Sequence, residues 1–195
     1  NAHNVYVVKT DVDGNLLWAK AYGTNGHEEG VCGIQTRDGG YIFLGLFGSS
    51  LIGDCDIYLI KTDDIGNVVW SKTYGGAAID YALDISQNIN GEYLIAGSTN
   101  SFGAGNYDAY ILRTDSVGAI IWSKVFGDSL FDYAQSISQV ALSEFVIKGG
   151  YGTNHSTANI CLFNADSTGN VVWAKTYGHG GANTNGSSMK PTSDG

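Results

Sequence analysis

One 14-residue phrase occurs four times in the chain at a nearly constant spacing. In its second copy, over residues 62–75, it reads Thr-Asp-Asp-Ile-Gly-Asn-Val-Val-Trp-Ser-Lys-Thr-Tyr-Gly. The spacing is 52, 52 and 51 residues when it is measured between the tryptophans, which are Trp18, Trp70, Trp122 and Trp173. A fixed period of this size is typical of folds in which one supersecondary unit is stacked or arranged radially. The repeat therefore restricts the fold more than any other feature of the sequence.

The phrase and the residues before it predict a β-hairpin. Residues 56–62 are rich in β-branched and aromatic side chains, as strands are. Residues 63–66 favour a turn, because an Asp accepts bonds from nearby backbone N–H groups and a Gly takes positive φ without a steric cost. Residues 67–74 form the return strand. In that strand Trp70, Lys72 and Tyr74 share one face, because side chains alternate.

Each repeat carries four strand patterns. In the second repeat they cover residues 56–62, 67–74, 80–87 and 92–98. Four short strands in a unit of about 50 residues are typical of a propeller blade. We therefore expect an all-β fold, a β-propeller of four-stranded blades of about 52 residues. The single propeller segment would span residues 1–195, with repeats at about 4–55, 56–107, 108–158 and an incomplete 159–195.

The strand patterns also predict how a blade is assembled. In the usual naming from the axis outward, the hairpin of residues 56–62 and 67–74 supplies strands C and D, residues 80–87 supply strand A, and residues 92–98 supply strand B. The fourth repeat stops after its copy of strand A at residues 183–190, so there are 15 strand patterns in all. Proteins avoid an unpaired edge inside a sheet. We therefore expect the remainder of a longer chain, or another segment, to complete the open blade; both a four-bladed and a larger ring are possible.

Composition narrows the classes of partner. The 195 residues include 10 Lys and Arg against 19 Asp and Glu, for a net charge of −9, which disfavours nucleic acid and anionic membranes. No apolar run reaches the length of a membrane span.

The three cysteines match no metal-binding spacing and are expected to be buried free thiols: Cys32, Cys55 and Cys161. The four histidines are expected to be solvated loop residues: His3, His27, His155 and His179.

Three stretches carry a resemblance to a known group of proteins. They are Thr-Arg-Asp-Gly-Gly-Tyr-Ile at residues 36–42, Asp-Ile-Tyr-Leu-Ile-Lys-Thr-Asp at 56–63 and Gly-Asn-Val-Val-Trp-Ser-Lys-Thr-Tyr-Gly-Gly at 66–76. They resemble the propeller repeats of large secreted and cell-surface proteins of bacteria and archaea. The Asp-x-x-Gly-x-x-x-Trp hairpin is also similar to PQQ-like and WD40-like propeller hairpins. The resemblance covers nearly the whole chain and implies an extracellular or cell-surface location. The quinone-binding residues of PQQ enzymes lie outside this hairpin, so we expect no cofactor.

The first hairpin turn offers a weak candidate for a calcium site. Asp11 and Asp13 have the spacing with which a calcium loop begins, and Ca²⁺ is bound by clustered oxygen ligands. The other three copies of the turn lack this spacing, and none has the distal Glu of a complete EF-hand loop. A hairpin turn explains all four copies, so we expect no metal, with Ca²⁺ at Asp11 and Asp13 as the alternative.

Two polar positions recur at the starts of strands. One holds Glu28, Asp80, Asp132 and Asn183 before strand A, and the other holds Asn4, Asp56, Asp108 and Asn159 before strand C. Such acceptors most simply bond loop N–H groups and fix the turn. Alternatively, a ring of these carboxylates binds a cation, or Glu28, Asp80 and Asp132 serve a glycan-active enzyme, whose paired carboxylates stand roughly 5–10 Å apart.

A lysine follows each tryptophan by two residues, at Lys20, Lys72, Lys124 and Lys175. Four lysines at equivalent positions suggest an anion-binding surface as one interpretation. A charged residue on an outermost strand also deters edge-to-edge pairing, and its alkyl stem can cover the face of the tryptophan. We favour this structural interpretation.

The loops between strands B and C vary most among the repeats. They cover residues 49–54, 98–107 and 151–157, and their candidate contact aromatics are Phe102, Tyr107 and Tyr151. Variable loops on a rigid scaffold are the default place for binding. With no catalytic motif in the sequence, we predict a non-catalytic extracellular module that acts as a scaffold or binds protein or glycan partners through these loops. The alternatives are a structural spacer in a large surface adhesin and a glycan-active or lectin-like propeller.

Overall fold

The structure is a computed structural model that describes residues 3–24, 26–49, 53–152, 159–178, 188–190 and 192. These residues form antiparallel sheets, so the expected all-β class is confirmed. The first sheet has two strands, β1 (Val5–Thr10) and β2 (Leu16–Tyr22). The second has β3 (Glu28–Gln35), β4 (Tyr41–Ser49), β5 (Asp54–Thr62) and β6 (Val68–Tyr74). The third has β7 (Asp80–Gln87), β8 (Tyr93–Thr99), β9 (Asp108–Thr114) and β10 (Ile120–Phe126). The fourth has β11 (Phe131–Ala141), β12 (Glu144–Gly152), β13 (Asn159–Asp166) and β14 (Val171–Tyr177).

Strand pairing follows the expected assignment A to D. Each four-stranded sheet has the order in which strands A and B of one repeat are followed by the hairpin of the next repeat, as in β3-β4-β5-β6. The hairpin strands β2, β6, β10 and β14 are therefore the edge strands that carry the lysine positions. Fourteen of the fifteen strand patterns are strands in the described part of the chain. The fifteenth, at residues 183–190, lies largely outside the described residues, and 188–190 are not in a strand.

In the described part of the chain there is no helix long and apolar enough to cross a membrane.

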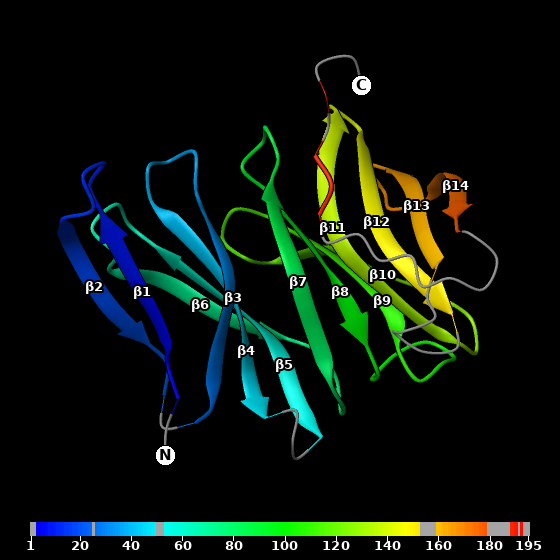
Figure 1. The fold of residues 1–195 in the computed structure, drawn as a ribbon, viewed down its shortest axis with the longest axis horizontal. Coiled ribbons are helices and arrows are strands. Elements are labelled where there is room, and N and C mark those ends of the chain that lie inside the picture. The colour runs from blue at the N-terminus through cyan, green and yellow to red at the C-terminus, as the bar shows by residue number, and fades with distance from the viewer. Residues whose placement is uncertain are drawn as a thin grey trace.

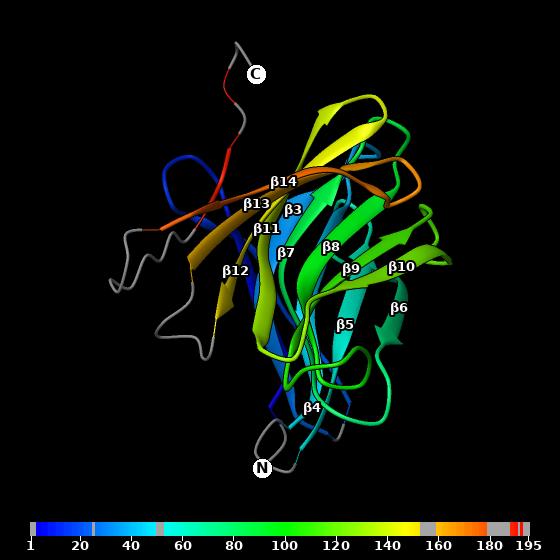
Figure 2. The ribbon, with the colours of Figure 1, turned by 90° about the vertical axis from the view of Figure 1, so that its right-hand side faces the viewer.

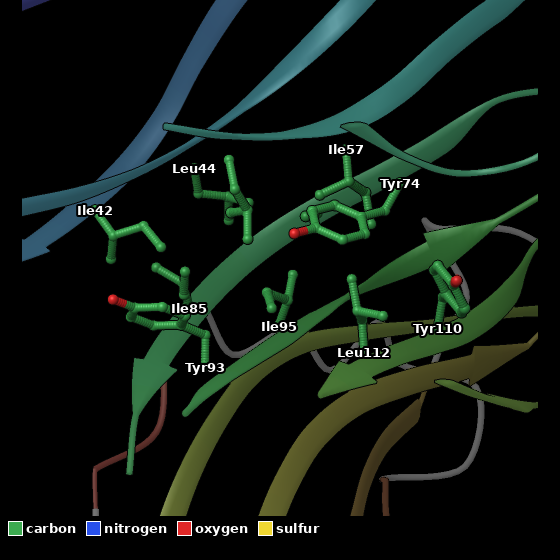
Figure 3. Close-up of a cluster of buried hydrophobic side chains, with 11 residues drawn as sticks. Ile42, Leu44, Ile57, Tyr74, Ile85, Tyr93, Ile95, Tyr110 and Leu112 are labelled. Carbon is green, nitrogen blue, oxygen red and sulfur yellow. The ribbon is translucent and has the colours of Figure 1, made fainter. Parts of the chain in front are cut away.

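The hydrophobic core lies between successive sheets. Side chains alternate along a strand, so both faces of an inner strand carry apolar residues: Ile42 and Leu44 of β4 point to the third sheet, and Phe43 to the first. Figure 3 shows the cluster between the second and third sheets, where Ile42, Leu44 and Ile57 face Ile95 and Leu112. Equivalent clusters fill the first and third junctions. Each junction is thus a layer of buried aliphatic and aromatic groups, the main source of favourable free energy in such a fold.

The four sheets follow one another along the longest axis of the molecule. Figure 1 shows β1 and β2 at one end and β13 and β14 at the other, so the described residues form an open row of sheets. Figure 2 shows β3, β7 and β11, the first strands of the three larger sheets, next to one another. The edge strands β6 and β10 lie at the opposite edge of their sheets, on the right of that view. Strand A of each sheet also carries a bulge at the same repeat position, between Gly30 and Cys32 in β3 and between Ala82 and Asp84 in β7.

The four hairpin turns share one hydrogen-bond pattern. In the second, Oδ1 of Asp63 accepts bonds from the N–H groups of Ile65 and Asn67 at 3.1 and 2.7 Å, while the Gly66 N–H donates to the Asp63 carbonyl. Gly66 has a φ of +79°, which only glycine adopts without strain. The predicted turn chemistry of the Asp-x-x-Gly phrase is therefore present.

Three of these turns, at Gly66, Gly118 and Gly169, also seat the tryptophan and lysine of the preceding sheet's edge strand; we call this contact the latch. At the second junction the Tyr74 hydroxyl donates to the Gly118 carbonyl at 2.8 Å. A Cβ added at Gly118 would lie 3.1 Å from the Trp70 ring, so the seat requires glycine. The first junction repeats the contact, with the Tyr22 hydroxyl on the Gly66 carbonyl at 2.8 Å. Gly66 and Gly118 are buried as a result.

The third latch uses a different hydrogen bond. Phe126 stands where the first two junctions have tyrosine, so no hydroxyl is available. The Trp122 indole N–H instead donates to the Ser167 carbonyl at 3.0 Å. The same hydrophobic seat therefore persists at Gly169 while the polar contact moves from one aromatic residue to another.

We predict that Tyr74→Phe lowers the free energy of unfolding by about 1–2 kcal/mol, because the buried Gly118 carbonyl loses its donor. Urea unfolding followed by tryptophan fluorescence measures the change. Tyr6→Phe is the control, because Tyr6 is 69% exposed and its substitution should change stability by less than about 0.5 kcal/mol. Equal effects of the two substitutions would show that the latch hydrogen bond contributes nothing.

Candidate functional site

The acidic residues that begin strand A are buried and hold the preceding turn. Asp80 is fully buried, and its Oδ2 accepts bonds from the Gly76 N–H at 2.8 Å and the Ser101 hydroxyl at 2.6 Å. Glu28 accepts from the N–H and hydroxyl of Thr24, and Asp132 accepts from the Asp128 N–H. The acceptor role that the sequence favoured for these residues is thus present at all three. Asn183 lies outside the described residues.

A second acidic residue stands beside two of these carboxylates. Asp56 and Asp80 both border Gly75, and Asp108 and Asp132 both border Gly127, where an added Cβ would collide with each pair. Asp108 accepts bonds from the N–H groups of Ala104 and Gly105 at 3.0 and 3.1 Å. Burial, and then the charges of Asp80 and Asp54, raise the pKa of Asp56. These pairs therefore lie in the junctions between sheets. Oδ2 of Asp80, Asp108 and Asp132 bonds the chain's own turns, whereas Oδ1 of Asp56 and of Asp80 is buried without a hydrogen-bond partner among the described residues.

Asp11 and Asp13 do not act as a pair. Oδ1 of Asp11 accepts from the N–H groups of Asp13 and Asn15, and its Oδ2 accepts from the Asn15 amide at 2.9 Å. These bonds, led by that of the Asn15 side chain, lower the pKa of Asp11. Within the described ranges, no group of three His, Cys, Asp or Glu side chains is placed to hold a metal ion.

The three candidate aromatics of the B–C loops lie in different places. Phe102 is 43% exposed and its ring contacts Tyr110, with centroids 5.8 Å apart. Tyr151 lines a cavity of about 380 Å³ between the third and fourth sheets, together with Phe126 and Phe163. Tyr107 lines a second cavity, and Tyr133 borders both. The structure thus brings Tyr107 and Tyr151 to neighbouring cavities and leaves Phe102 outside them.

The cavity at Tyr107 has an unusually aromatic wall; we call it the aromatic cavity. It measures about 350 Å³ and is lined by Tyr81, Leu83, Ser98, Tyr107, Phe131 and Tyr133. Its four rings form a continuous row. Tyr81 stacks on Tyr107 at 5.9 Å, Tyr107 meets Phe131 at 5.3 Å, and Phe131 meets Tyr133 at 5.9 Å. Burial, followed by the neighbouring Tyr81 hydroxyl, raises the pKa of Tyr107.

Sequence reasoning identified Tyr107 but missed the other three rings. The row forms because Tyr107 and Phe131 are joined by a parallel bridge between adjacent sheets, in which the Asp132 N–H donates to the Tyr107 carbonyl at 2.8 Å. The same bridge joins Cys55 to Ile79 and His3 to His27. These pairs are related by the 52-residue period, so the period itself was the signal that could have brought the partners together.

The same bridge brings two of the histidines together. His3 is exposed, as expected of a solvated residue, and His27 is half-buried. Their rings stack with centroids 4.3 Å apart, a contact that the sequence did not predict, and Nε2 of His27 lies 3.8 Å from a carboxylate oxygen of Glu29. They occupy the bridge positions of the first junction, which explains their contact. His155 and His179 lie outside the described residues.

The cysteines and lysines keep the structural roles expected for them. All three cysteines are free thiols; Cys55 is buried, and Cys32 and Cys161 are half-buried. Burial raises the pKa of Cys32 and of Cys55 to about 11, which makes them poor nucleophiles. Lys72 and Lys175 lie over the rings of Trp70 and Trp173, each 5.9 Å from the centroid.

No protein-family model matches the chain, and no curated protein matches it.

We predict that Asp56→Asn stabilises the protein at neutral pH. Because the pKa of Asp56 is raised in the folded state, the folded protein binds this proton more tightly than the unfolded chain does. Stability therefore falls as pH rises from the ordinary pKa of 3.8 through the raised pKa of the folded state. The substitution removes this loss, and its benefit should vanish below the ordinary value of 3.8, where Asp56 is protonated in both states. The chain itself has Asn4 and Asn159 at this repeat position. The midpoints of urea unfolding, measured for both proteins at neutral pH and again below pH 3.8, test the effect.

Asp166→Asn is the control of opposite sign. Bonds from the Thr168 hydroxyl and the Asn170 N–H hold the pKa of Asp166 at about 2, so its charged form stabilises the fold above the ordinary pKa and this stabilisation is lost in acid. The substitution should therefore lower the urea midpoint at neutral pH. A lower neutral-pH midpoint for Asp56→Asn as well would contradict the account of the buried pair.

Proposed function

We propose that the chain is a segment of a secreted or cell-surface β-propeller that binds neutral glycans, without catalysis, in the aromatic cavity. The observation that carries the proposal is the row of four aromatic rings lining a cavity of about 350 Å³. The radial architecture is supported by the repeat period, the A-B-C-D pairing of the sheets and the contact of successive first strands.

The chemistry of the cavity suits a sugar better than a peptide or an anion. A pyranose ring offers apolar C–H faces that pack on aromatic faces, and hydroxyls that exchange hydrogen bonds with tyrosine hydroxyls. The wall supplies both, from Tyr81 and Tyr107, with the Ser98 hydroxyl as a further polar group. Ligand sites of this kind are concave, largely apolar and equipped with few polar groups. The net charge of −9 disfavours an anionic glycan.

The carboxylates favour binding over hydrolysis. A glycosidase needs one carboxylic acid to protonate the leaving oxygen and another to act at the opposite face of the sugar. Asp80 and Asp132 are buried and accept bonds from their own turns, and neither borders the aromatic cavity. Glu28 belongs to the first junction and contacts Thr24. We therefore assign these acids to the scaffold.

A structural spacer is the second candidate, and the latch is the observation that favours it. Three successive junctions join the sheets by the same aromatic seat, which suits a chain selected for regular propagation. A spacer requires no ligand in the aromatic cavity, so the binding experiment below separates the two functions.

We predict that a glycan array of neutral oligosaccharides detects binding, and that Tyr107→Ala weakens the affinity for the bound glycan at least about tenfold, equivalent to about 1.4 kcal/mol. Isothermal titration calorimetry measures the affinity. Phe102→Ala is the matched control, because Phe102 is an exposed aromatic of the same loop that lies outside the cavity. Absence of any bound glycan, or equal losses in the two variants, would count against the proposal and favour the spacer.

A further inference from the structure

The third junction contains a cavity at the place where an aromatic ring fills the second junction; we call it the third-junction cavity. It measures about 380 Å³ and lies between the third and fourth sheets. Its wall includes Ala109, Phe126, Tyr133, Tyr151, Cys161 and Phe163. Three wall positions hold smaller side chains than their counterparts one repeat earlier, and these replacements account for the space.

The largest replacement is at Cys161, which occupies the repeat position of Tyr58 and Tyr110. Both tyrosines are buried, Tyr58 in the core cluster of the first junction and Tyr110 in that of the second. Figure 3 shows the Tyr110 ring within its cluster. Cys161 packs against the equivalent cluster of the third junction but carries no ring, so this junction lacks the group that fills the other two.

Two further replacements enlarge the same space. Ala109 stands where the second junction has Ile57, and Ala174 stands where it has Ser123. Both alanines line the cavity. Ser123 is the hydrogen-bond partner of Tyr110, so the third junction has lost the ring together with the hydroxyl that holds it. A buried side chain that is removed without repacking leaves a void that lowers stability. An occupant supplied from outside the chain accounts for the retention of such a void.

We propose that the third-junction cavity binds a small aromatic molecule that carries no negative charge, as a ligand site separate from the aromatic cavity. The missing tyrosine ring indicates the shape of the occupant, and the wall supplies aromatic partners. The rings of Phe126 and Phe163 lie with centroids 5.0 Å apart, and aromatic rings pack on one another edge to face or offset. The volume is sufficient, since apolar cavities of roughly 150 Å³ already bind benzene. The proposal does not depend on the proposed function.

The charges at the cavity exclude an anionic ligand. Asp128 and Asp132 belong to the wall, and the described wall residues include no lysine, arginine or histidine. Burial raises the pKa of Asp132, the bond from the Asp128 N–H lowers it, and the charges of Asp128 and Asp108 raise it again. A carboxylate on the ligand would add a further negative charge to this group. A neutral ring, or a ring that bears an ammonium group, avoids that repulsion.

The test compares three phenols that share the tyrosine ring and differ in charge: 4-ethylphenol, tyramine and 4-hydroxyphenylacetate. Isothermal titration calorimetry at neutral pH should detect binding of the neutral and cationic compounds but not of the anion. Cys161→Tyr restores the ring of the other repeats and should weaken the affinity at least about tenfold. Cys161→Ala is the matched control, because it removes the thiol and leaves the space open, so it should bind as the wild type does.

A second variant fills the cavity from the opposite sheet. Ala109→Ile introduces the residue of the second junction, should weaken binding in the same way, and replaces Cys161→Tyr if that variant fails to fold. The site is distinguished from the glycan site by exchange of the readouts. Tyr107→Ala should leave phenol binding unchanged, because Tyr107 does not line the third-junction cavity, and Cys161→Tyr should leave glycan binding unchanged.

A chemical readout locates the ligand. Bound 4-ethylphenol should slow the alkylation of Cys161 by iodoacetamide, measured by mass spectrometry of peptides. Cys32 is the internal control, because it is also a half-buried free thiol but lies outside this cavity. Absence of binding and of protection would show that the cavity takes no such ligand. Equal affinity of Cys161→Tyr and the wild type, or binding of the anion as tight as that of tyramine, would also overturn the proposal.

Discussion

The seat that three of the Asp-x-x-Gly turns, at Gly66, Gly118 and Gly169, give to the preceding sheet is the contact on which the arrangement of sheets depends. The layers of aliphatic residues between sheets supply most of the favourable free energy, but burial of apolar area is not directional and does not fix how one sheet lies on the next. The latch is directional. A tyrosine hydroxyl at two junctions, or the Trp122 indole N–H at the third, must reach one carbonyl, and a tryptophan ring must rest where only a glycine leaves room. The repeat phrase therefore encodes both the hairpin and the contact that joins it to its neighbour.

A second constraint acts at the other edge of each junction, where acidic side chains are buried. Asp80 and Asp132 hold the turn that leads into strand A, and each has another aspartate beside it across a glycine. Burying two carboxylates together is costly, and the cost appears as the raised pKa of Asp56. The fold accepts this cost because Oδ2 of Asp80 and Oδ2 of Asp132 satisfy loop N–H groups that would otherwise be unpaired. Asparagine at the equivalent positions 4 and 159 fits this role, since it keeps an acceptor and carries no charge.

Much of the fold could be predicted from the sequence, because it follows from local rules repeated at a fixed period. Alternation located the strands, the Asp and Gly of the phrase located the turns, and the length of the repeat gave the pairing of each hairpin with the strands of the previous repeat. The aromatic cavity could not be predicted in the same way. Its rings come from two strands and a loop of different sheets, and they meet only because a backbone bridge joins Tyr107 to Phe131. The stacking of His3 on His27 was missed for the same reason. At these positions the backbone repeats and the side chains do not, so a pattern of residue types cannot reveal the contact.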